Sequence, residues 1–379
     1  MPKGSRHVCC QCLGLLYFFC SFVLGDGGAC EMGDVQCIDQ DGHRLTAITY
    51  FRAHDCGSNF TLDVRRAKQK SAPFSAFAVP VAELRDLSYF MRPQSYELFG
   101  CRVPAVPMDD AGLIHLPSTI TRLKIDVGLS HNVPHSQLWL EKISDLAVFG
   151  FEPNLQAVGD LLSGRKRAQV SERWTPYFDH KFVGTQFFLF PVALGSERGH
   201  VDFHATVNDA AHSSVLEPDK NSIANMGEYD VYPVAMFPLS DLLSRIPWGF
   251  DGDPGVFAIV EHLKIDAQGH DLEVLRGAGH YLSERVVCVT AEKFTWGYTK
   301  PGHGQQDLLD FMYREGFGLL RDEGDSFTFV NLNLMDDWFT YTNDVDCSGG
   351  DLFYLEDGCL KDFNGHSYAC SEKHPDVQT

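Results

Sequence analysis

Residues 125–132 read Ile-Asp-Val-Gly-Leu-Ser-His-Asn, and they complete an apolar run that starts near Arg122. A short β-rich run of this kind predicts a buried strand. Glycine soon after the acid permits a tight turn where the strand ends, against a nucleoside ligand. This stretch therefore predicts one strand of an α/β sheet with a ligand site at its carboxyl end.

The residues around this strand, from about 120 to 335, alternate β-rich apolar runs with segments of helical period. Strands are predicted at 122–127, 147–152, 187–194, 262–266 and 285–292, and helices at 136–144, 155–162, 239–245, 272–282 and 305–315. Residues 317–331 predict two further strands joined by a turn at 322–325. Successive βαβ units indicate a mostly parallel sheet, and the final hairpin adds one antiparallel strand at its edge.

Two further stretches place polar residues at predicted strand ends. The second strand ends in Phe151-Glu152-Pro153-Asn154, and Glu152 follows Asp126 by a spacing near the roughly 20 residues typical of an acid that binds ribose hydroxyls. Residues 263–275 read LKIDAQGHDLEVL, which predicts a strand, a short loop and the start of a helix. The carboxyl ends of parallel strands share one edge of a sheet, so these residues are expected near one another.

Together these stretches, with Val274-Leu275-Arg276-Gly277, resemble the FkbM family of methyltransferases over about residues 120–335. The resemblance implies a seven-stranded, Rossmann-like class I methyltransferase sheet and S-adenosylmethionine as methyl donor. It also implies a hydroxyl oxygen as acceptor, on a sugar or another small molecule. Asn132 stands where the commoner pattern has a second glycine, and Gln268 stands where it has Glu.

The resemblance also implies roles for single residues. Asp126 and Gly128 would line the methionine end of the cofactor, and Glu152 would hold the ribose. The expected cofactor-binding set is completed by their neighbours in the same two loops: Ser130, Asn132 and Asn154.

The expected catalytic residues follow from the chemistry of methyl transfer, in which positioning does most of the work and a base removes the acceptor's proton. Asp266 is the first candidate because it ends a strand at the ligand edge, and His270 and Glu292 at the ends of neighbouring elements are the next. Each also has a plain structural alternative, as a loop cap, an exposed helix start or a partner of Lys293.

Two other functions remain open from the sequence. Asp251-Gly252-Asp253 is a pattern with which a metal-dependent glycosyltransferase of the secretory pathway holds a nucleotide sugar, although it also reads as a turn. Gln268 and Asn132 permit an inactive Rossmann-like binding module. No metal site is expected, because the pairs His131 with His135 and His200 with His204 lack a clear helix.

The charge and the N-terminal composition of the chain limit its possible partners and its compartment. Fifty-one acidic against 31 basic side chains give a formal net charge of -20, which disfavours nucleic acid. Lys3 and Arg6 precede an uncharged apolar stretch at 8–24, so residues 1–29 predict a cleaved signal peptide or a retained membrane anchor. The product is thus expected to be secreted, or lumenal with an N-terminal anchor, and Asn59-Phe60-Thr61 is a glycosylation sequon.

The chain ends are expected to be irregular extensions tied by disulfides. Residues 30–119 are rich in Pro, Gly and Cys and predict a cap next to the methyltransferase domain at 120–335, while 336–379 predict a tail. Eight cysteines lie outside the leader, mostly towards the two ends, a pattern that favours disulfides in an oxidising compartment. At least one is expected in the tail, among Cys347, Cys359 and Cys370.

Overall fold

The structure is a computed structural model of the 379-residue chain. The residues it describes are 7–11, 17–21, 36–38, 44–46, 84–91, 95–98, 101–130, 133–163, 178–206, 212–219, 229–249, 257–293, 298, 303–334, 347, 353–356, 359–362 and 367–370. Everything below refers to these residues.

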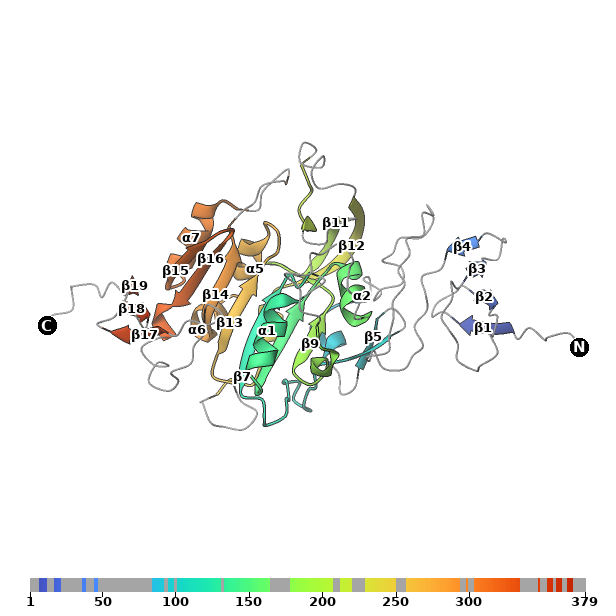
Figure 1. Ribbon diagram of the computed structural model, residues 1–379, viewed down its shortest axis with the longest axis horizontal. Helices are drawn as coiled ribbons and strands as arrows, with labels where there is room; N and C mark the ends of the chain where they lie inside the picture. The colour runs from blue at the N-terminus through green and yellow to red at the C-terminus, as the bar shows by residue number, and fades with distance from the viewer. Residues whose placement is uncertain are drawn as a thin grey trace, which may run out of the picture.

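A seven-stranded sheet forms the centre of the molecule (Figure 1). From one edge to the other its strands are β15 (Phe317–Glu323), β16 (Ser326–Asn331), β14 (Val286–Glu292), β13 (Val260–Ile265), β7 (Arg122–Val127), β8 (Leu146–Phe151) and β9 (Phe187–Phe190). The strands from β14 to β9 run parallel, and β16 is antiparallel to both β14 and β15. The predicted parallel sheet with a closing hairpin is confirmed, and the antiparallel strand is the inner member of that hairpin.

The strand order places the chain reversal between β7 and β13. β7, β8 and β9 follow one another towards one edge, whereas β13 returns to the other side of β7. In open parallel sheets, ligands bind beyond the carboxyl ends of the strands at such a switch point. The fold therefore directs attention to the loops that follow β7, β8 and β13.

Helices alternate with these strands. They are α1 (Pro134–Lys142), α2 (Leu155–Ser163), α4 (Ser240–Leu243), α5 (Asp271–Gly277), α6 (Tyr281–Arg285) and α7 (Gln305–Arg314), with short 3-10 turns η3 (Leu87–Phe90) and η4 (His180–Phe182). The single helix predicted at 272–282 is two helices. The first ends at Gly277, and Gly279 adopts a φ of +60°, which interrupts the helical backbone before α6 begins.

A second, three-stranded sheet was not expected. It joins β10 (Ala193–Leu194), β12 (Tyr229–Phe237) and β11 (Gly199–Thr206), with β11 antiparallel to β12. The predicted strand at 187–194 is therefore wrong as one element, since β9 ends at Phe190 and β10 pairs with β12 instead. The pairing of β11 with β12 could not be predicted from the sequence, because a hairpin is recognised by a short turn and these two strands are separated by a long stretch.

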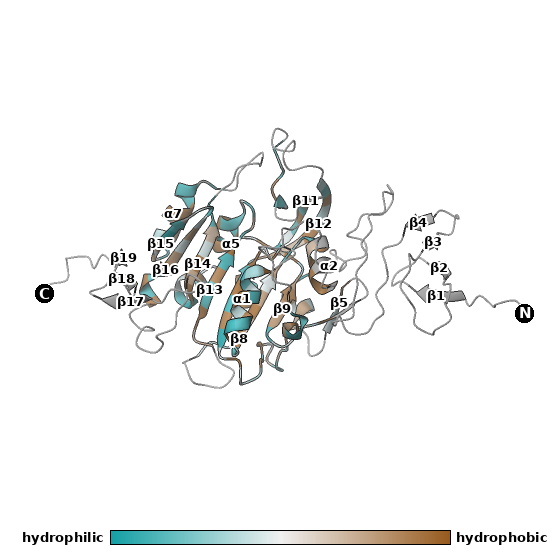
Figure 2. Cartoon of the chain, in the orientation of Figure 1, coloured by the Kyte–Doolittle hydropathy of each residue, from teal (hydrophilic) through white to brown (hydrophobic). Residues whose placement is uncertain are grey.

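Aromatic and aliphatic side chains fill the core. Every residue of β8 and β9 is buried, and Phe151 stacks on Phe190 at 4.7 Å between ring centroids. Burying one Phe stabilises a fold by about 1.5–3 kcal/mol. Figure 2 shows the apolar residues concentrated on the strands of the main sheet, while α7 is largely hydrophilic.

Part of the predicted N-terminal cap shares this core. Residues 84–116 contain η3 and the hairpin of β5 (Ser95–Leu98) with β6 (Cys101–Pro104). Phe90 is fully buried against Phe190, and the Tyr96 hydroxyl donates a hydrogen bond to the Leu189 carbonyl at 2.7 Å. This segment packs on the main sheet, and the predicted boundary at residue 120 stays a prediction.

The two ends of the chain contain strands where irregular extensions were expected. The N-terminal part forms a four-stranded sheet of β1 (His7–Gln11), β2 (Tyr17–Ser21), β3 (Gln36–Ile38) and β4 (Arg44–Thr46), and the C-terminal part a three-stranded sheet of β17 (Phe353–Glu356), β18 (Cys359–Asp362) and β19 (Ser367–Cys370). Strands of five residues or fewer give two or three residues per face, too few for their period to stand out in a sequence. Within the described residues, no helix is long and apolar enough to cross a membrane.

One disulfide joins the tail to the main sheet. Cys347 pairs with Cys288 of β14, 59 residues away, and both are buried. This bond uses one of the three tail cysteines, but its partner lies in a central strand rather than in a peripheral segment, and the prediction of disulfide-tied extensions stays a prediction. Cys359 and Cys370 are directly opposite each other in the pairing of β18 with β19.

Candidate active site

An open cavity lies at the carboxyl ends of β7, β8 and β13. Its walls come from the loops after these strands, from β9–β10 and from the second sheet, and they comprise Val127, Gly128, Ser130, Glu152, Pro153, Val192, Ala193, Leu194, Phe203, Ser213, Val215, Asp266, Ala267, Gln268 and His270.

The loops after β7, β8 and β13 are bonded to one another through their backbones. The Gly128 amide donates to the Phe151 carbonyl at 2.9 Å, and the Asp266 amide donates to the Val127 carbonyl at 3.0 Å. Gly128 has a φ of +76°, and a Cβ there would lie 1.9 Å from the Asp266 carbonyl oxygen. The glycine predicted from the sequence is therefore required for the close approach of two loops that form the cavity wall.

Glu152 presents a buried carboxylate on this wall, with only 5% of the residue exposed. Its Oε2 accepts a hydrogen bond from the Ser130 amide and its Oε1 one from the Asn154 amide, both at 2.7 Å. Burial raises the pKa of Glu152 to about 7, although the two amide donors oppose the shift. Each oxygen keeps acceptor capacity for a further donor such as a hydroxyl.

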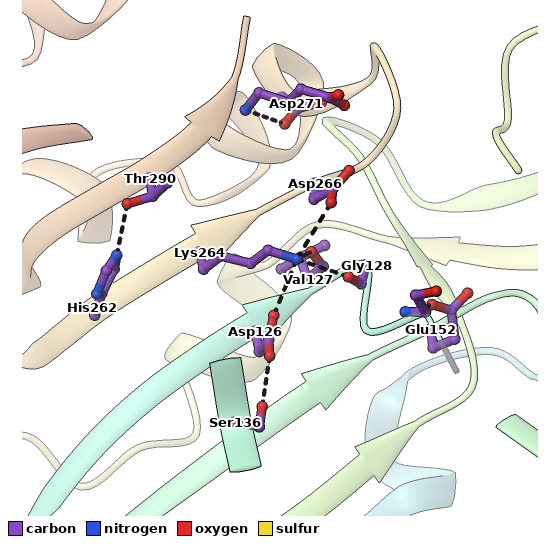
Figure 3. Close-up of polar contacts among 12 residues, drawn as sticks. Asp126, Val127, Gly128, Ser136, Glu152, His262, Lys264, Asp266, Asp271 and Thr290 are labelled. Carbon is purple, nitrogen blue, oxygen red and sulfur yellow. Dashed lines mark hydrogen bonds and ion pairs between the residues drawn. The ribbon is translucent and has the colours of Figure 1, made fainter. Parts of the chain in front are cut away.

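Beneath the cavity, Lys264 of β13 bridges two strand ends (Figure 3). Its Nζ donates to the Gly128 carbonyl at 2.8 Å and lies 3.4 Å from Asp126 Oδ1 and 3.7 Å from Asp266 Oδ2. Burial alone lowers the pKa of Lys264, but the two carboxylates raise it overall. Asp126, 1% exposed, also accepts the Ser136 hydroxyl at 2.6 Å. Lys264 and Asp126 thus form a buried ion pair that supports the loop.

Three carboxyl groups gather on the side of β13 and β14. Asp266 lines the cavity with 43% of its side chain exposed. Burial first, then the charges of Asp266 and Asp271, raise the pKa of Glu292 to about 9. Burial and the charge of Asp266 raise the pKa of Asp271 to about 7, and its Oδ1 accepts the Glu292 amide at 2.9 Å. At neutral pH this side therefore holds at least one proton.

His270 lines the same cavity, and both its ring nitrogens are buried without a hydrogen-bond partner among the described residues. Burial lowers its pKa, so the neutral imidazole is favoured. The ring lies beside β10, where a Cβ on Gly195 would be 3.1 Å from Nε2. A buried imidazole without partners is costly unless a ligand or water satisfies it.

The predicted site residues therefore divide into three groups. Gly128, Ser130, Glu152, Asp266 and His270 line the cavity together. Three others support it from behind: Asp126 pairs with Lys264, Asn154 caps α2 by accepting the Ala157 amide at 3.3 Å, and Glu292 reaches the cavity side through Gln268. Asn132, His131 and the Asp251–Asp253 pattern lie outside the described residues.

Several contributors were not singled out from the sequence. Phe203 and Ser213 come from the second sheet and the loop beside it, and no local motif marks them. The role of Lys264 could have been predicted from the sequence. A lysine within an apolar strand needs a carboxylate partner, and Asp126 lies on the neighbouring strand. Among the described residues, no group of three or more His, Cys, Asp and Glu side chains is placed to hold a metal ion.

Comparison with known proteins relates part of the chain to one family. Residues 145–319 match the model of the methyltransferase FkbM domain. This part of the chain is therefore similar to methyltransferase FkbM domains. A crystal structure of a methyltransferase FkbM from Methylobacillus flagellatus is similar with 15% sequence identity and a TM-score of 0.31, over 56% of this chain and 44% of that one. The search of curated proteins found no match.

Proposed function

We propose that this protein is an S-adenosylmethionine-dependent O-methyltransferase whose acceptor is a hydroxyl of a glycan or another small molecule. The family domain supports methyl transfer in general. The observation that carries the cofactor assignment is Glu152, a buried carboxylate fixed by two backbone amides on the wall of the cavity.

The residues present fit this cofactor. Paired ribose hydroxyls are donors, and Glu152 offers acceptors that no described side chain occupies. Apolar side chains of β9–β10 and β11, among them Val192, Leu194 and Phe203, offer a surface for a flat base. Gly128 and Ser130 line the cavity on the same side as Glu152, and we assign the amino-acid end of the cofactor to their loop.

The cofactor supplies an activated methyl group, and the chain has to position the acceptor and take its proton. Asp266 is the most exposed carboxylate of the cavity and lies beside the Lys264 cation. It accepts the hydroxyl proton as the oxygen becomes methylated. His270, neutral and without a partner, orients the acceptor by one hydrogen bond.

Calorimetry tests the cofactor assignment directly. We expect S-adenosylmethionine and S-adenosylhomocysteine to bind with micromolar affinity, about -8 kcal/mol. Neither heat nor a thermal shift at millimolar cofactor, with folded protein, would refute the proposal. Labelled methyl donor incubated with fractionated extract of the source organism then identifies the acceptor.

The compartment follows from a separate observation. The Cys288–Cys347 disulfide supports an oxidising environment, in keeping with the N-terminal signal or anchor that the sequence predicts. We propose a secreted or lumenal protein. Free thiols at both positions in protein isolated from its source would contradict this.

A further inference from the structure

Gln268 adopts a backbone conformation that most residues avoid. Its φ is +51° and that of the following Gly269 is +89°. A left-handed conformation is unfavourable for a residue with a side chain, because the Cβ comes too close to the following carbonyl oxygen. The Ser214 hydroxyl donates to the Gln268 carbonyl at 2.9 Å and so helps to hold this conformation. The strained turn brings the Gln268 side chain between β13 and β14.

The amide of Gln268 uses both of its ends. Nε2 donates to Asp266 Oδ1 at 2.7 Å and to Glu292 Oε2 at 2.9 Å, and Oε1 accepts the Tyr298 hydroxyl at 3.3 Å. An NH2 group has two hydrogens, which match the two carboxyl groups. A carboxylate at this position has no hydrogen to offer either of them.

The charges around Gln268 explain why this matters. Three carboxyl groups lie close to one another here: Asp266 directly after β13, Asp271 at the start of α5 and Glu292 at the end of β14. Lys264 is the cation beside Asp266. Lys293 is engaged with Asp322 of β15, His270 is neutral, and burial followed by Glu292 raises the pKa of Tyr298. The charge of one lysine, which is already paired with Asp126, is therefore too little to neutralise all three acids.

We propose that Gln268 is a positioning residue that joins Asp266 and Glu292 into a pair sharing one proton, and so holds the Asp266 carboxylate towards the acceptor. The inference rests on the proposed function for the role of Asp266, but the shared proton is a property of the free protein. With Glu292 protonated, Asp266 alone of the two carries a charge, while the Gln268 amide donates to one oxygen of each carboxyl group. Both carboxyl groups then keep one orientation without mutual repulsion.

The test is a carboxyl titration by infrared spectroscopy on the full chain without ligand. At pH 8 the wild type should show a protonated-carboxyl band that disappears in Glu292→Gln. In Gln268→Glu the added acid should move the midpoint of the Glu292 band upward by about one pH unit or more. The matched control is Gln306→Glu, because Gln306 also donates to an aspartate, Asp310, at 2.7 Å, but on the exposed face of α7.

A second variant guards against failure to fold. Gln268→Met keeps the size, removes the donors and adds no charge, so it should also raise the midpoint, but by less than Gln268→Glu. Its methylation rate should fall at least tenfold while its affinity for S-adenosylhomocysteine changes by less than threefold.

The outcomes are separable. Midpoints in Gln268→Glu and Gln268→Met equal to that of Gln306→Glu would overturn the inference, as would a wild-type spectrum at pH 8 without the Glu292 band. Wild-type protein that fails to bind S-adenosylhomocysteine would refute the proposed function instead and leave the titration result standing.

Discussion

The two sides of the cavity are built in different ways. On the β7–β8 side, the Glu152 carboxylate is fixed by two backbone amides of residues in the same two loops. On the β13–β14 side, Asp266 and Glu292 are held by side chains, chiefly the amide of Gln268. The position of Glu152, which backbone amides hold, depends only on the register of the strands. The positions of Asp266 and Glu292 depend on every side chain of their network and on its protonation state.

The disulfide provides the largest expected effect, and it tests whether the β14 side needs support from the tail. Cys347→Ser should lower the free energy of unfolding by roughly 2–4 kcal/mol, because the bond closes a long loop in the unfolded chain. Chemical unfolding with and without reductant measures this. Reduced wild type should match the variant, and unchanged stability in Cys347→Ser would show that the tail gives β14 no support.

The Asp266 carboxylate on the β13–β14 side is expected to act in turnover rather than in cofactor binding. Asp266→Asn keeps the shape and removes the charge, so the methylation rate should fall roughly a hundredfold, with affinity for S-adenosylhomocysteine nearly unchanged. Rate and calorimetric affinity are measured on the same preparation. Equal losses in both would assign Asp266 to the cofactor and remove the contrast between the two sides.

The Glu152 carboxylate on the opposite side is expected to show the reverse pattern. In Glu152→Gln one oxygen becomes an NH2 group that faces a backbone amide donor, whichever way the side chain turns. Affinity for S-adenosylhomocysteine should fall roughly tenfold or more, about 1.5–3 kcal/mol. Glu284→Gln, on the exposed surface of α6, is the control, and equal affinity in the two variants would contradict the placement of the ribose.

This difference also decides what the sequence can predict. Gly128 and Glu152 could be located because their roles follow from strand ends and backbone turns, which short motifs encode. Gln268 stood out only as a departure that suggested lost activity, since its partners Glu292 and Tyr298 lie 24 and 30 residues further along the chain. The second sheet stayed hidden because β11 and β12 pair across a long insertion.

The last expected effect is the pH dependence of stability on the β13–β14 side. The folded-state pKa of Glu292, about 9, lies above its ordinary value of 4.5, so the folded protein binds more protons than the unfolded chain between these values. Its contribution to stability is complete below about pH 4.5 and is lost as the pH rises through 9. Asp271 and Glu152, with pKa values of about 7, act in the same direction over a narrower window.

Glu292→Gln separates this contribution from the others, because the amide stays neutral at every pH and has nearly the same size. Thermal unfolding from pH 5 to pH 9 should show wild type losing stability as the pH rises, and the variant losing less. Glu284→Gln should follow wild type. Parallel curves for Glu292→Gln and wild type would mean that Glu292 is already ionised at neutral pH, and that the β13–β14 side is held by charge rather than by a shared proton.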